Sequence, residues 1–368
     1  MSTTRHRTFR SFAVVLLGAL PFVAVACGSS GGSSATKPAA DKTSSTTAST
    51  APVDLRLGYF PNVTHAPALI GIEGGLFEKS LGSNVTLKPQ PFNAGPDVVT
   101  AIYSDALDAS FIGPGPSISA FQKSNGDAIR IVSGAASGGA FLVTKPSITK
   151  PADLEGKKIA SPQLGNTQDI ALRSWLKKQG FTTDTSGGGD VSVVPQDNAL
   201  TLTAFQQGQI DGAWVPEPWA TRLVKEGGGK ILVDEATLWP KGRFVTTDLI
   251  VSTKFLTAHP DVVQQLIEGE VAAIDLVKTN RTKAEGYVVS GITKATGKAI
   301  APDLVTASFD SITFTTDPIV TSLLKNAQES KTLGFTTTDD VKGIYDLSIL
   351  NKVLQAKSLP TVAVPANA

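Results

Sequence analysis

Apolar and polar positions alternate along residues 55–60 and 85–92 in the manner of short β-strands. Between these runs, residues 65–77 carry apolar side chains at helical spacing, and residues 94–107 repeat that pattern. The second of these helices opens at Pro96, in a first turn where the missing N–H would have no partner anyway. Strand-like runs follow at 108–112, 131–133 and 140–144. The first part of the chain is therefore predicted to alternate strands with helices.

The second part of the chain repeats this plan. Strands are predicted at 157–160, 191–195 and 212–215, and helices at 166–179 and 198–207. Strands that alternate with helices favour right-handed βαβ units and a parallel sheet. After residue 233 a strand-like run at 245–256 is followed by a long helix that opens at His259-Pro260, and the remainder reads as mostly helical.

A short internal repeat relates the two parts. TAIYSDALDASFI (100–112) aligns without gaps with TAFQQGQIDGAWV (203–215), and the shared unit is a helix, a tight turn and a strand. A Pro-rich segment follows each copy, GPGPS at 113–117 and PEPWA at 216–220. Both segments are predicted to be loops at the carboxyl ends of parallel strands, which is where open α/β sheets bind ligands.

The body from residue 53 onward is longer than a single hydrophobic core usually organises, so two lobes are expected. We expect residues 53–145 to form the first part of lobe 1 and residues 146–244 to form lobe 2. Residues 245–368 are expected to return to lobe 1 and add C-terminal helices. A chain that leaves one lobe and returns to it favours a hinge between them.

The N-terminus is predicted to be a secretory leader over residues 1–26. Three Arg residues precede an apolar run from Phe12 to Ala26, which is too short to be a comfortable spanning helix. Cys27 is the only cysteine, and its setting resembles the bacterial lipoprotein box, although Ala24 stands where Leu is common. This resemblance implies a lipid anchor on Cys27, with residues 27–52 as a Gly/Ser/Thr-rich tether outside the cell membrane. An ordinary leader that leaves a free thiol is the alternative.

Composition excludes several classes of function. The formal net charge is +1, and no basic stripe interleaves with aromatics, so nucleic acid is not an expected partner. The body contains no cysteine, and its two histidines, His65 and His259, lie far apart in the sequence. The sequence therefore predicts no metal site, no cofactor and no Ser-His-Asp arrangement.

Several segments together resemble the substrate-binding components of ABC importers, in the aliphatic sulfonate, taurine and nitrate group. The resemblance rests on LRLGYFPNVTHAPALIGIEGGLFEK, FNAGPDVVTAI, FIGPGPSI, SGAASGGAFLV, DLEGKKIASPQLGNTQD and AWVPEPWATRLVKEGGGK. It extends over about residues 53–265 and is loose over the C-terminal hundred. It implies an α/β, two-lobed type II periplasmic-binding fold, each lobe a mixed, mostly parallel sheet flanked by helices. It also implies a monomer that captures a solute and delivers it to a permease and ATPase complex.

Ligand contacts are expected from the loops that follow the strands. A helix N-terminus presents free N–H groups and a partial positive charge, so it can hold an anion without a lysine. The candidate ligand-binding residues are Asn62, Thr64, His65, Asn93, Gly115, Ser137, Gly138, Gly139, Gln163, Asn166, Thr167, Gln168, Glu217 and Trp219.

Structural roles are open for several of these residues. Thr64 and Asn93 are also candidate helix caps, and residues 137–139 also suit a chain that crosses between lobes. Trp219 either covers an apolar part of a ligand or packs under a loop between the lobes. Glu217 would face an amine of the ligand or a basic partner.

The leading hypothesis is a binding protein for a small organic anion, with an aliphatic sulfonate first. Taurine, nitrate or bicarbonate, and a thiamine-pyrimidine precursor are the alternatives within this class. An enzyme on the same fold is the second hypothesis, but a sulfinate-cleaving enzyme would need a nucleophilic cysteine that the body lacks. A surface adhesin or scaffold is the third, and it would not need matched polar loops on two lobes.

Overall fold

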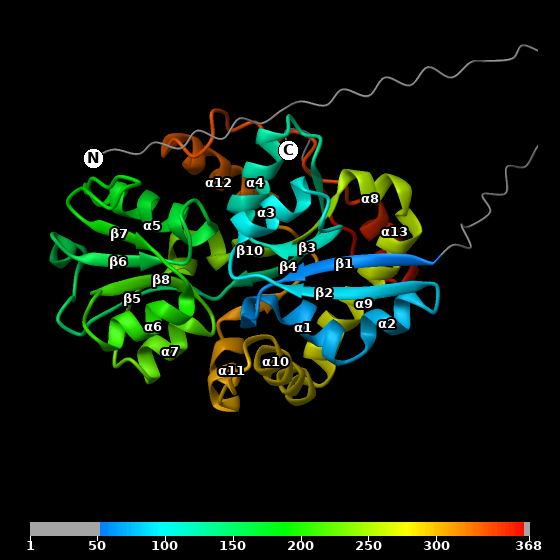
Figure 1. The fold of residues 1–368 in the computed structure, drawn as a ribbon, viewed down its shortest axis with the longest axis horizontal. Helices are drawn as coiled ribbons and strands as arrows, with labels where there is room; N and C mark the ends of the chain where they lie inside the picture. The colour runs from blue at the N-terminus through cyan, green and yellow to red at the C-terminus, as the bar shows by residue number, and fades with distance from the viewer. Residues whose placement is uncertain (1–51, 364–368) are drawn as a thin grey trace, which may run out of the picture. The chain divides into compact units, whose positions relative to one another are not determined.

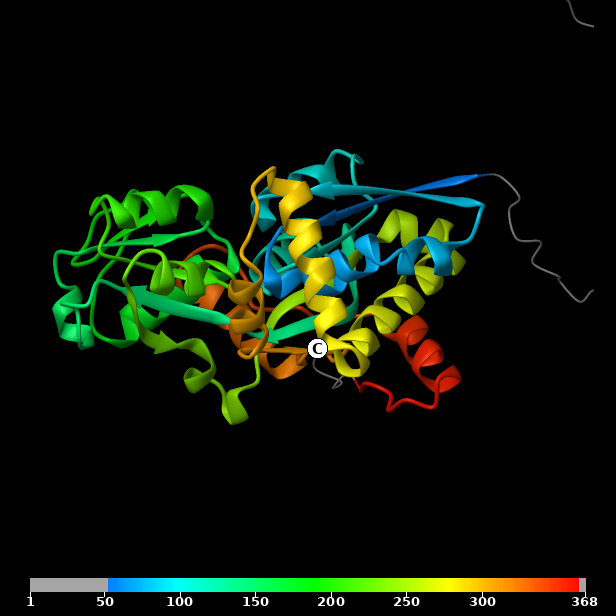
Figure 2. The ribbon, with the colours of Figure 1, turned by 90° about the horizontal axis from the view of Figure 1, so that it is seen from below.

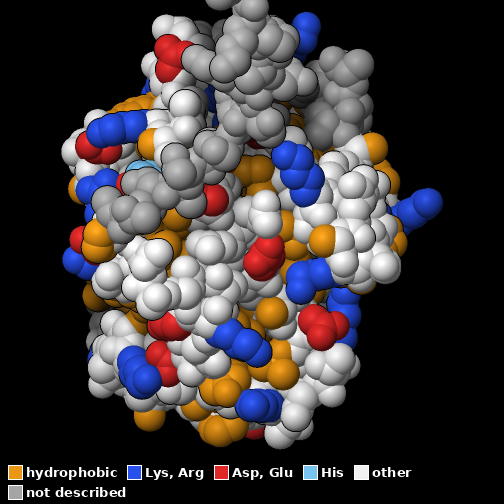
Figure 3. Space-filling view, turned by 90° about the vertical axis from the view of Figure 1, so that its right-hand side faces the viewer, with side chains coloured by type: hydrophobic (Ala, Val, Ile, Leu, Met, Phe, Trp, Pro, Cys, Tyr) orange, Lys and Arg blue, Asp and Glu red, His pale blue; other side chains and the backbone are white. Residues whose placement is uncertain are grey.

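The computed structural model describes residues 52–363 as two β-sheets, each flanked by helices (Figure 1). The predicted leader, Cys27 and nearly all of the tether lie outside these residues. Within the described range, no helix combines the length and the apolar character needed to cross a bilayer. On the face shown in Figure 3, basic and acidic side chains are interspersed.

The larger lobe is built on a six-stranded sheet with strand order β11-β4-β10-β3-β1-β2. Its strands are β1 (Val53–Tyr59), β2 (Val85–Pro91), β3 (Ala109–Ile112), β4 (Ile129–Gly138), β10 (Val245–Ser252) and β11 (Ile312–Phe314). β1 pairs in parallel with β2 and β3, whereas β10 is antiparallel to β3 and β4, and β11 is antiparallel to β4.

The smaller lobe is built on a five-stranded sheet with order β7-β6-β8-β5-β9. Its strands are β5 (Ala140–Thr144), β6 (Lys158–Ser161), β7 (Ser192–Pro195), β8 (Gly212–Pro216) and β9 (Lys230–Asp234). β6 is parallel to β7 and β8, while β5 is antiparallel to β8 and β9. Both sheets are therefore mixed, as predicted, but neither is mostly parallel: two pairings are parallel in each sheet, against three antiparallel in the larger one and two in the smaller. Parallel pairing is confined to the βαβ units, because the segments that cross between lobes join their sheets antiparallel.

Helices cover both faces of each sheet (Figures 1 and 2). One face of the larger sheet packs on α1 (Ala66–Glu73), α2 (Leu76–Leu81), α8 (Thr253–Ala258), α9 (Pro260–Thr279), α10 (Arg281–Thr296), α11 (Pro302–Phe309) and α13 (Ser348–Ala356). The other face packs on α3 (Gly95–Tyr103), α4 (Pro114–Lys123) and α12 (Val320–Thr332). In the smaller lobe, α5 (Thr167–Lys178) covers one face, and α6 (Asn198–Gln206) and α7 (Trp219–Lys225) cover the other. Short 3-10 helices are η1 (Val63–His65), η2 (Pro151–Leu154), η3 (Glu235–Leu238) and η4 (Pro240–Gly242).

The chain first crosses between the lobes at Gly138 and Gly139, between β4 and β5. Both glycines have positive φ, 86° and 70°, a conformation that other residues rarely adopt. Residues 140–144 therefore belong to the smaller lobe, and the lobe boundary expected at residue 145 falls later than this crossing. The chain returns to the larger lobe through η3 and η4 and enters β10 at Val245.

The internal repeat predicted from sequence corresponds to repeated structure. Helix α3 with strand β3, and helix α6 with strand β8, occupy the aligned segments. Each first strand lies between the two strands that follow it, in the orders β2-β1-β3 and β7-β6-β8. The segments after the repeats are not loops throughout, because GPGP forms the first turn of α4 and Trp219 begins α7.

Candidate ligand-binding site

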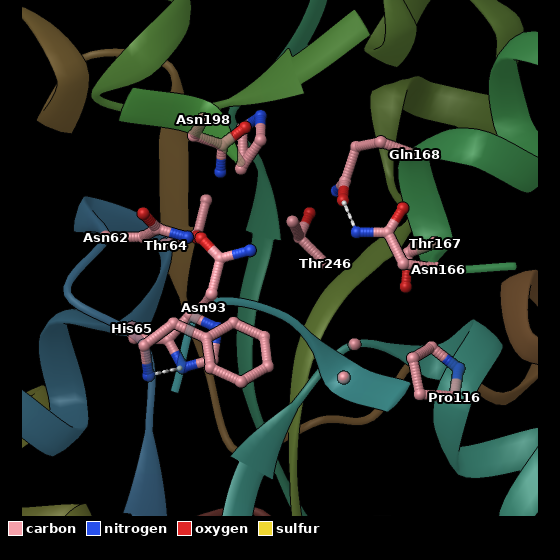
Figure 4. Close-up of a pocket in the computed structure, with 14 residues that line it drawn as sticks. Asn62, Thr64, His65, Asn93, Pro116, Asn166, Thr167, Gln168, Asn198 and Thr246 are labelled. Carbon is pink, nitrogen blue, oxygen red and sulfur yellow. Dashed lines mark hydrogen bonds between the residues drawn. The ribbon is translucent and has the colours of Figure 1, made fainter. Parts of the chain in front are cut away.

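A polar pocket lies between the two lobes, at the carboxyl ends of their parallel strands (Figure 4). In this structure it encloses a cavity of about 20 Å³, which is room for about one water molecule. Its lining comes from both lobes and comprises Phe60, Asn62, Thr64, His65, Asn93, Gly95, Gly113, Pro116, Asn166, Thr167, Gln168, Asn198, Pro216 and Thr246.

Five helices begin at this pocket, because each follows a strand whose carboxyl end faces it. They are α1, α3 and α4 of the larger lobe and α5 and α6 of the smaller lobe. The lining includes at least one residue from the beginning of each of these helices, either in its first turn, at its N-cap or just before it. Helix N-termini carry unpaired N–H groups and a partial positive charge. Their convergence makes the pocket favourable for a negatively charged group.

Asn62 is held in place from the opposite lobe. Trp219 Nε1 donates to Asn62 Oδ1 at 2.8 Å. With its oxygen engaged in this way, Asn62 has its Nδ2 group left to donate to a ligand. Figure 4 shows this nitrogen turned toward the middle of the pocket. Trp219 is thus not part of the lining but orients a residue that is.

His65 is buried and uncharged. Burial lowers its pKa to about 3, so the ring stays neutral at physiological pH. Its Nδ1 accepts a hydrogen bond from the Phe60 N–H at 3.3 Å, and the two rings pack with centroids 4.3 Å apart. Since Nδ1 accepts, the proton of the neutral ring lies on Nε2, which makes that atom a donor.

The start of α5 supplies three neighbouring polar residues, the N-cap Asn166 and the first two residues of the helix. Asn166 caps the helix, and its Oδ1 accepts from the Asp169 N–H at 3.0 Å. Asn166 Nδ2 also donates to Gln168 Oε1 at 3.4 Å, a bond visible in Figure 4. Gln168 Nε2 then remains available to a ligand. Thr167 Oγ1 accepts from the Gly115 N–H of the larger lobe at 3.3 Å, so this side chain joins the two lobes.

Asn93, in the loop before α3, and Asn198, the first residue of α6, add two more amide side chains to the lining. Asn93 Nδ2 donates across the lobe boundary to Asp197 Oδ1 at 2.7 Å, so Asn93 is not the side-chain cap of α3. Asn198 is buried, and its Oδ1 has no hydrogen-bond partner among the described residues. A buried polar atom without a partner is costly, so a ligand or water is expected to pair with it.

No Lys, Arg, Asp or Glu side chain is among the described residues that line the pocket. Nor do the described residues contain a group of three His, Cys, Asp or Glu placed to hold a metal ion. The chemistry available to the pocket is therefore hydrogen bonding from amides, hydroxyls and one neutral imidazole. Such a set suits reversible binding of an anion, since helix termini supply the positive potential.

A sequence model of the NMT1-like family matches residues 48–290. The chain belongs to the NMT1-like family. The taurine-binding periplasmic protein of Escherichia coli is 28% identical over 207 residues, covering 56% of this chain and 62% of that protein. The putative aliphatic sulfonates-binding protein of Bacillus subtilis is 24% identical over 363 residues, covering 94% of this chain and 97% of that protein. The chain thus spans less than two thirds of the taurine-binding relative but nearly all of the second.

Solved structures share the fold of this NMT1-like protein. The alkanesulfonate-binding protein SsuA of Xanthomonas axonopodis pv. citri, bound to MOPS, superposes with a TM-score of 0.63 at 20% identity, covering 77% of this chain and 94% of that one. The periplasmic nitrate-binding protein NrtA of Synechocystis gives 0.68 at 15% identity, covering 84% and 90%. These neighbours have the periplasmic-binding-protein fold, which is therefore the fold of this chain. The relatives and structures named here are binding proteins, not enzymes.

The structure of the NMT1-like protein brings seven of the predicted ligand-binding residues into the pocket lining and leaves seven outside it. Those in the lining are Asn62, Thr64, His65, Asn93, Asn166, Thr167 and Gln168. The residues outside it are Gly115, Ser137, Gly138, Gly139, Gln163, Glu217 and Trp219. Ser137, Gly138 and Gly139 form the first crossing, and Thr246 Oγ1 donates to Gly138 O at 2.6 Å. Gln163 Nε2 donates to Asp97 Oδ1 at 3.3 Å and joins the lobes at the surface.

Glu217 holds the lobes together instead of facing an amine or a basic side chain. Its carboxylate accepts from the N–H and hydroxyl of Thr221, in the first turn of α7, at 3.0 and 2.9 Å. It also accepts from Ser308 Oγ of the larger lobe at 3.1 Å, while its backbone O accepts from the Val63 N–H at 3.0 Å. Burial raises the pKa of Glu217. The WVPEPW stretch therefore fastens the smaller lobe to the larger one.

Sequence reasoning missed several lining residues, and the internal repeat contained the signal for four of them. The register that aligns Thr100 with Thr203 also aligns Gly95 with Asn198 and Gly113 with Pro216. Each of these pairs contributes one residue to the lining from each lobe. Phe60, Pro116 and Thr246 had no comparable signal, because their place depends on how the lobes pack.

Trp219→Phe is expected to weaken ligand binding by roughly two- to tenfold, the range for one lost hydrogen bond. Phenylalanine keeps a ring beneath Arg222 but cannot donate to Asn62, so the closed lobes lose one bond and Asn62 loses its orientation. Calorimetric titration of the variant measures the change. Trp175→Phe is the control, since Trp175 packs on Trp214 with centroids 5.9 Å apart, away from the pocket. Equal affinities for Trp219→Phe and wild type would contradict this role.

Proposed function

We propose that this protein is the solute-binding component of an ABC importer and captures a small organic anion, an aliphatic sulfonate first. The observation that carries the proposal is the uncharged pocket at which five helix N-termini converge between two lobes. Helix termini stabilise an anion without a fixed counter-charge, so the ligand is bound reversibly and can be passed on. The names of the relatives support the same class of cargo.

The alternatives within this class differ in how they would use the pocket. Nitrate or bicarbonate is supported by the small volume of the closed cavity, about 20 Å³. The ammonium group of taurine would need an acceptor, and Asn198 Oδ1 is one, whereas Glu217 is engaged elsewhere. A thiamine-pyrimidine precursor would stack on an aromatic ring, for which Phe60 is available in the lining. A sulfonate presents three oxygens to the amide and hydroxyl donors.

The proposal includes a place for the protein outside the cell membrane. A lipid on Cys27 and the tether of residues 27–52 would hold the body close to the permease and its ATPase. We expect a monomer that docks on the permease with both lobes closed around the ligand.

Thermal unfolding of the purified protein with a panel of anions tests the proposed function. The panel contains short alkanesulfonates, taurine, nitrate, bicarbonate, sulfate and a formylated aminopyrimidine. A ligand present at a thousand times its dissociation constant adds about 4 kcal/mol, a rise in Tm on the order of ten degrees. The largest rise is expected with an alkanesulfonate. A rise with none of the anions would reject the proposal.

Asn198→Asp shows whether any rise in Tm comes from this pocket. The change preserves shape, and an acidic residue is favourable at the first position of α6, so the protein should remain folded. A carboxylate in the pocket repels an anion, and we expect affinity to fall more than tenfold. Asn280→Asp is the matched control, because Asn280 caps α10 on the surface. A full rise in Tm with Asn198→Asp would place the anion elsewhere.

A further inference from the structure

Helix α12 lies at the boundary between the lobes, beside α4 of the larger lobe and α5 of the smaller lobe (Figure 1). Leu323 and Ala327 are buried in the core of the larger lobe, so they fix the helix to that lobe. Ser322, Lys325 and Glu329 follow one another at intervals of three and four residues and therefore form a separate stripe along the helix. Each side chain of this stripe has a partner outside the core of the larger lobe.

The first partner is the end of the return crossing, the segment 235–244 through which the chain passes back to the larger lobe. Ser322 Oγ accepts from the N–H of Val245, the residue at which β10 begins, at 2.9 Å. Ser322 is buried, and its hydroxyl also donates to Ile319 O at 2.9 Å. This contact fixes one end of the return crossing to the start of α12.

The second partner is an indole in the middle of the return crossing. Lys325 Nζ lies 3.9 Å from the ring centroid of Trp239 and donates to Leu238 O at 3.4 Å. A cation over an indole face is attracted by the negative potential of the ring. Trp239 is buried and stacks on Phe244, with the ring planes 9° apart. Lys325 therefore holds a rigid, well-packed part of the crossing against α12.

Trp239 is in turn tied to the smaller lobe through a buried carboxylate. Its Nε1 donates to Glu235 Oε1 at 3.4 Å, and Nε1 of Trp214 donates to Glu235 Oε2 at 2.7 Å. Trp214 belongs to β8 and is fully buried in the smaller lobe. If the smaller lobe rotates away, Trp239 must either leave Lys325 or lose its bond to Glu235.

The third partner is α5, the helix that supplies three residues to the pocket. Glu329 Oε1 lies 2.5 Å from Nζ of Lys178, the last residue of α5. The Glu329 side chain is only 13% exposed, so solvent screens this ion pair less than a fully exposed one. Phe335, just after α12, lies at the other end of α5, where a Cβ on Gly165 would be 3.3 Å from its ring. The α12 segment thus contacts both ends of α5.

We propose that α12 is a brace that holds the two lobes closed, and that Lys325 and Glu329 set how much of the protein is closed before a ligand binds. Neither residue lines the pocket, so they act on the closed arrangement and not on the ligand. The family model matches only as far as residue 290, so the brace follows from contacts of this chain itself. Apparent affinity falls in proportion to the fraction of protein that is closed, which makes the brace a control on binding.

Electron–electron resonance distances between spin labels on the two lobes test the brace in the ligand-free, full-length protein. Labels at Ser104→Cys and Gln207→Cys, with Cys27→Ser, occupy exposed and equivalent positions of the internal repeat. A population at longer distance should grow as the brace is weakened. We expect the closed-to-open ratio to fall by about 2- to 30-fold in Lys325→Met. In Glu329→Gln it should fall by about 1.4- to 5-fold.

Two further variants show whether the contacts themselves are responsible. Lys325→Arg keeps a cation over Trp239 and should retain the wild-type distances. Lys331→Met removes an ion pair of the same helix that stays within the larger lobe, Lys331 to Asp339 at 2.8 Å, and should also leave them unchanged. The brace is overturned if Lys325→Met and Glu329→Gln give the wild-type distances, or if Lys331→Met opens the lobes as much as they do. No ligand is used, so the result is independent of the proposed function.

Discussion

Replacing Gly113 with alanine should weaken ligand binding by about 5- to 150-fold while both lobes remain folded. Gly113 lies in the larger lobe, and a Cβ at this position would be 2.2 Å from Thr167 Oγ1 of the smaller lobe. The backbone of Gly113 is extended, with φ −78° and ψ 160°, so alanine causes no strain within its own lobe. The clash occurs only when the lobes close, and overpacking of this kind costs roughly 1–3 kcal/mol.

Binding and unfolding measured together distinguish lost closure from lost folding. The Tm of the ligand-free variant should change little, and its dissociation constant should rise. Adding Thr167→Ala removes the hydroxyl that the new methyl group meets, so the double variant should recover part of the affinity, a coupling expected only of residues in contact. Gly286→Ala is the control, because nothing lies within 4 Å of a Cβ there. Unchanged affinity in Gly113→Ala would mean that the bound state does not bring Gly113 against Thr167.

Glu270→Gln should stabilise the protein at neutral and alkaline pH and reduce the pH dependence of its unfolding. Glu270 lies on α9 in the interior of the larger lobe, and neither carboxylate oxygen has a hydrogen-bond partner among the described residues. Burial raises its pKa from 4.5 to about 8. Asp248, also buried, has its pKa raised by desolvation and by the charge of Glu270.

The sign of the pH effect follows from these values. Between pH 4.5 and 8 the folded protein keeps a proton on Glu270 that the unfolded chain releases. The contribution of Glu270 to the free energy of unfolding is therefore complete below pH 4.5 and is lost as pH rises toward 8. About 3 kcal/mol of it is lost by pH 7. Glutamine has no proton to release, so this loss disappears in the variant.

Thermal unfolding at pH 5 and pH 8 measures the difference. Over this range the Tm of wild type should fall relative to that of Glu270→Gln by on the order of ten degrees. Asp275→Asn changes an exposed acid on the same helix and should leave the wild-type dependence intact. Parallel pH profiles for wild type and Glu270→Gln would contradict the assignment.

Local pattern in the sequence was sufficient to predict most elements of the two lobes. The helix predicted at 166–179 is α5 (Thr167–Lys178), and its Asn166 cap is read from adjacent residues alone. Periodicity and capping depend on side chains within a few positions, so the chain itself contains that information. The repeat at 100–112 and 203–215 likewise predicted matching segments at the carboxyl end of one strand in each sheet, although both segments begin helices.

Contacts between residues distant in sequence decided the rest. Glu217 and Trp219 looked like ligand contacts but bond to Ser308 and Asn62 across the lobe boundary. The burial of Glu270 depends on how α9 packs on the sheet. By itself, the sequence determined the two α/β lobes and the polar loops at the strand ends, because these follow from local periodicity and turn chemistry. The tertiary structure alone decided which loops enclose the pocket, since that depends on how the lobes close on each other.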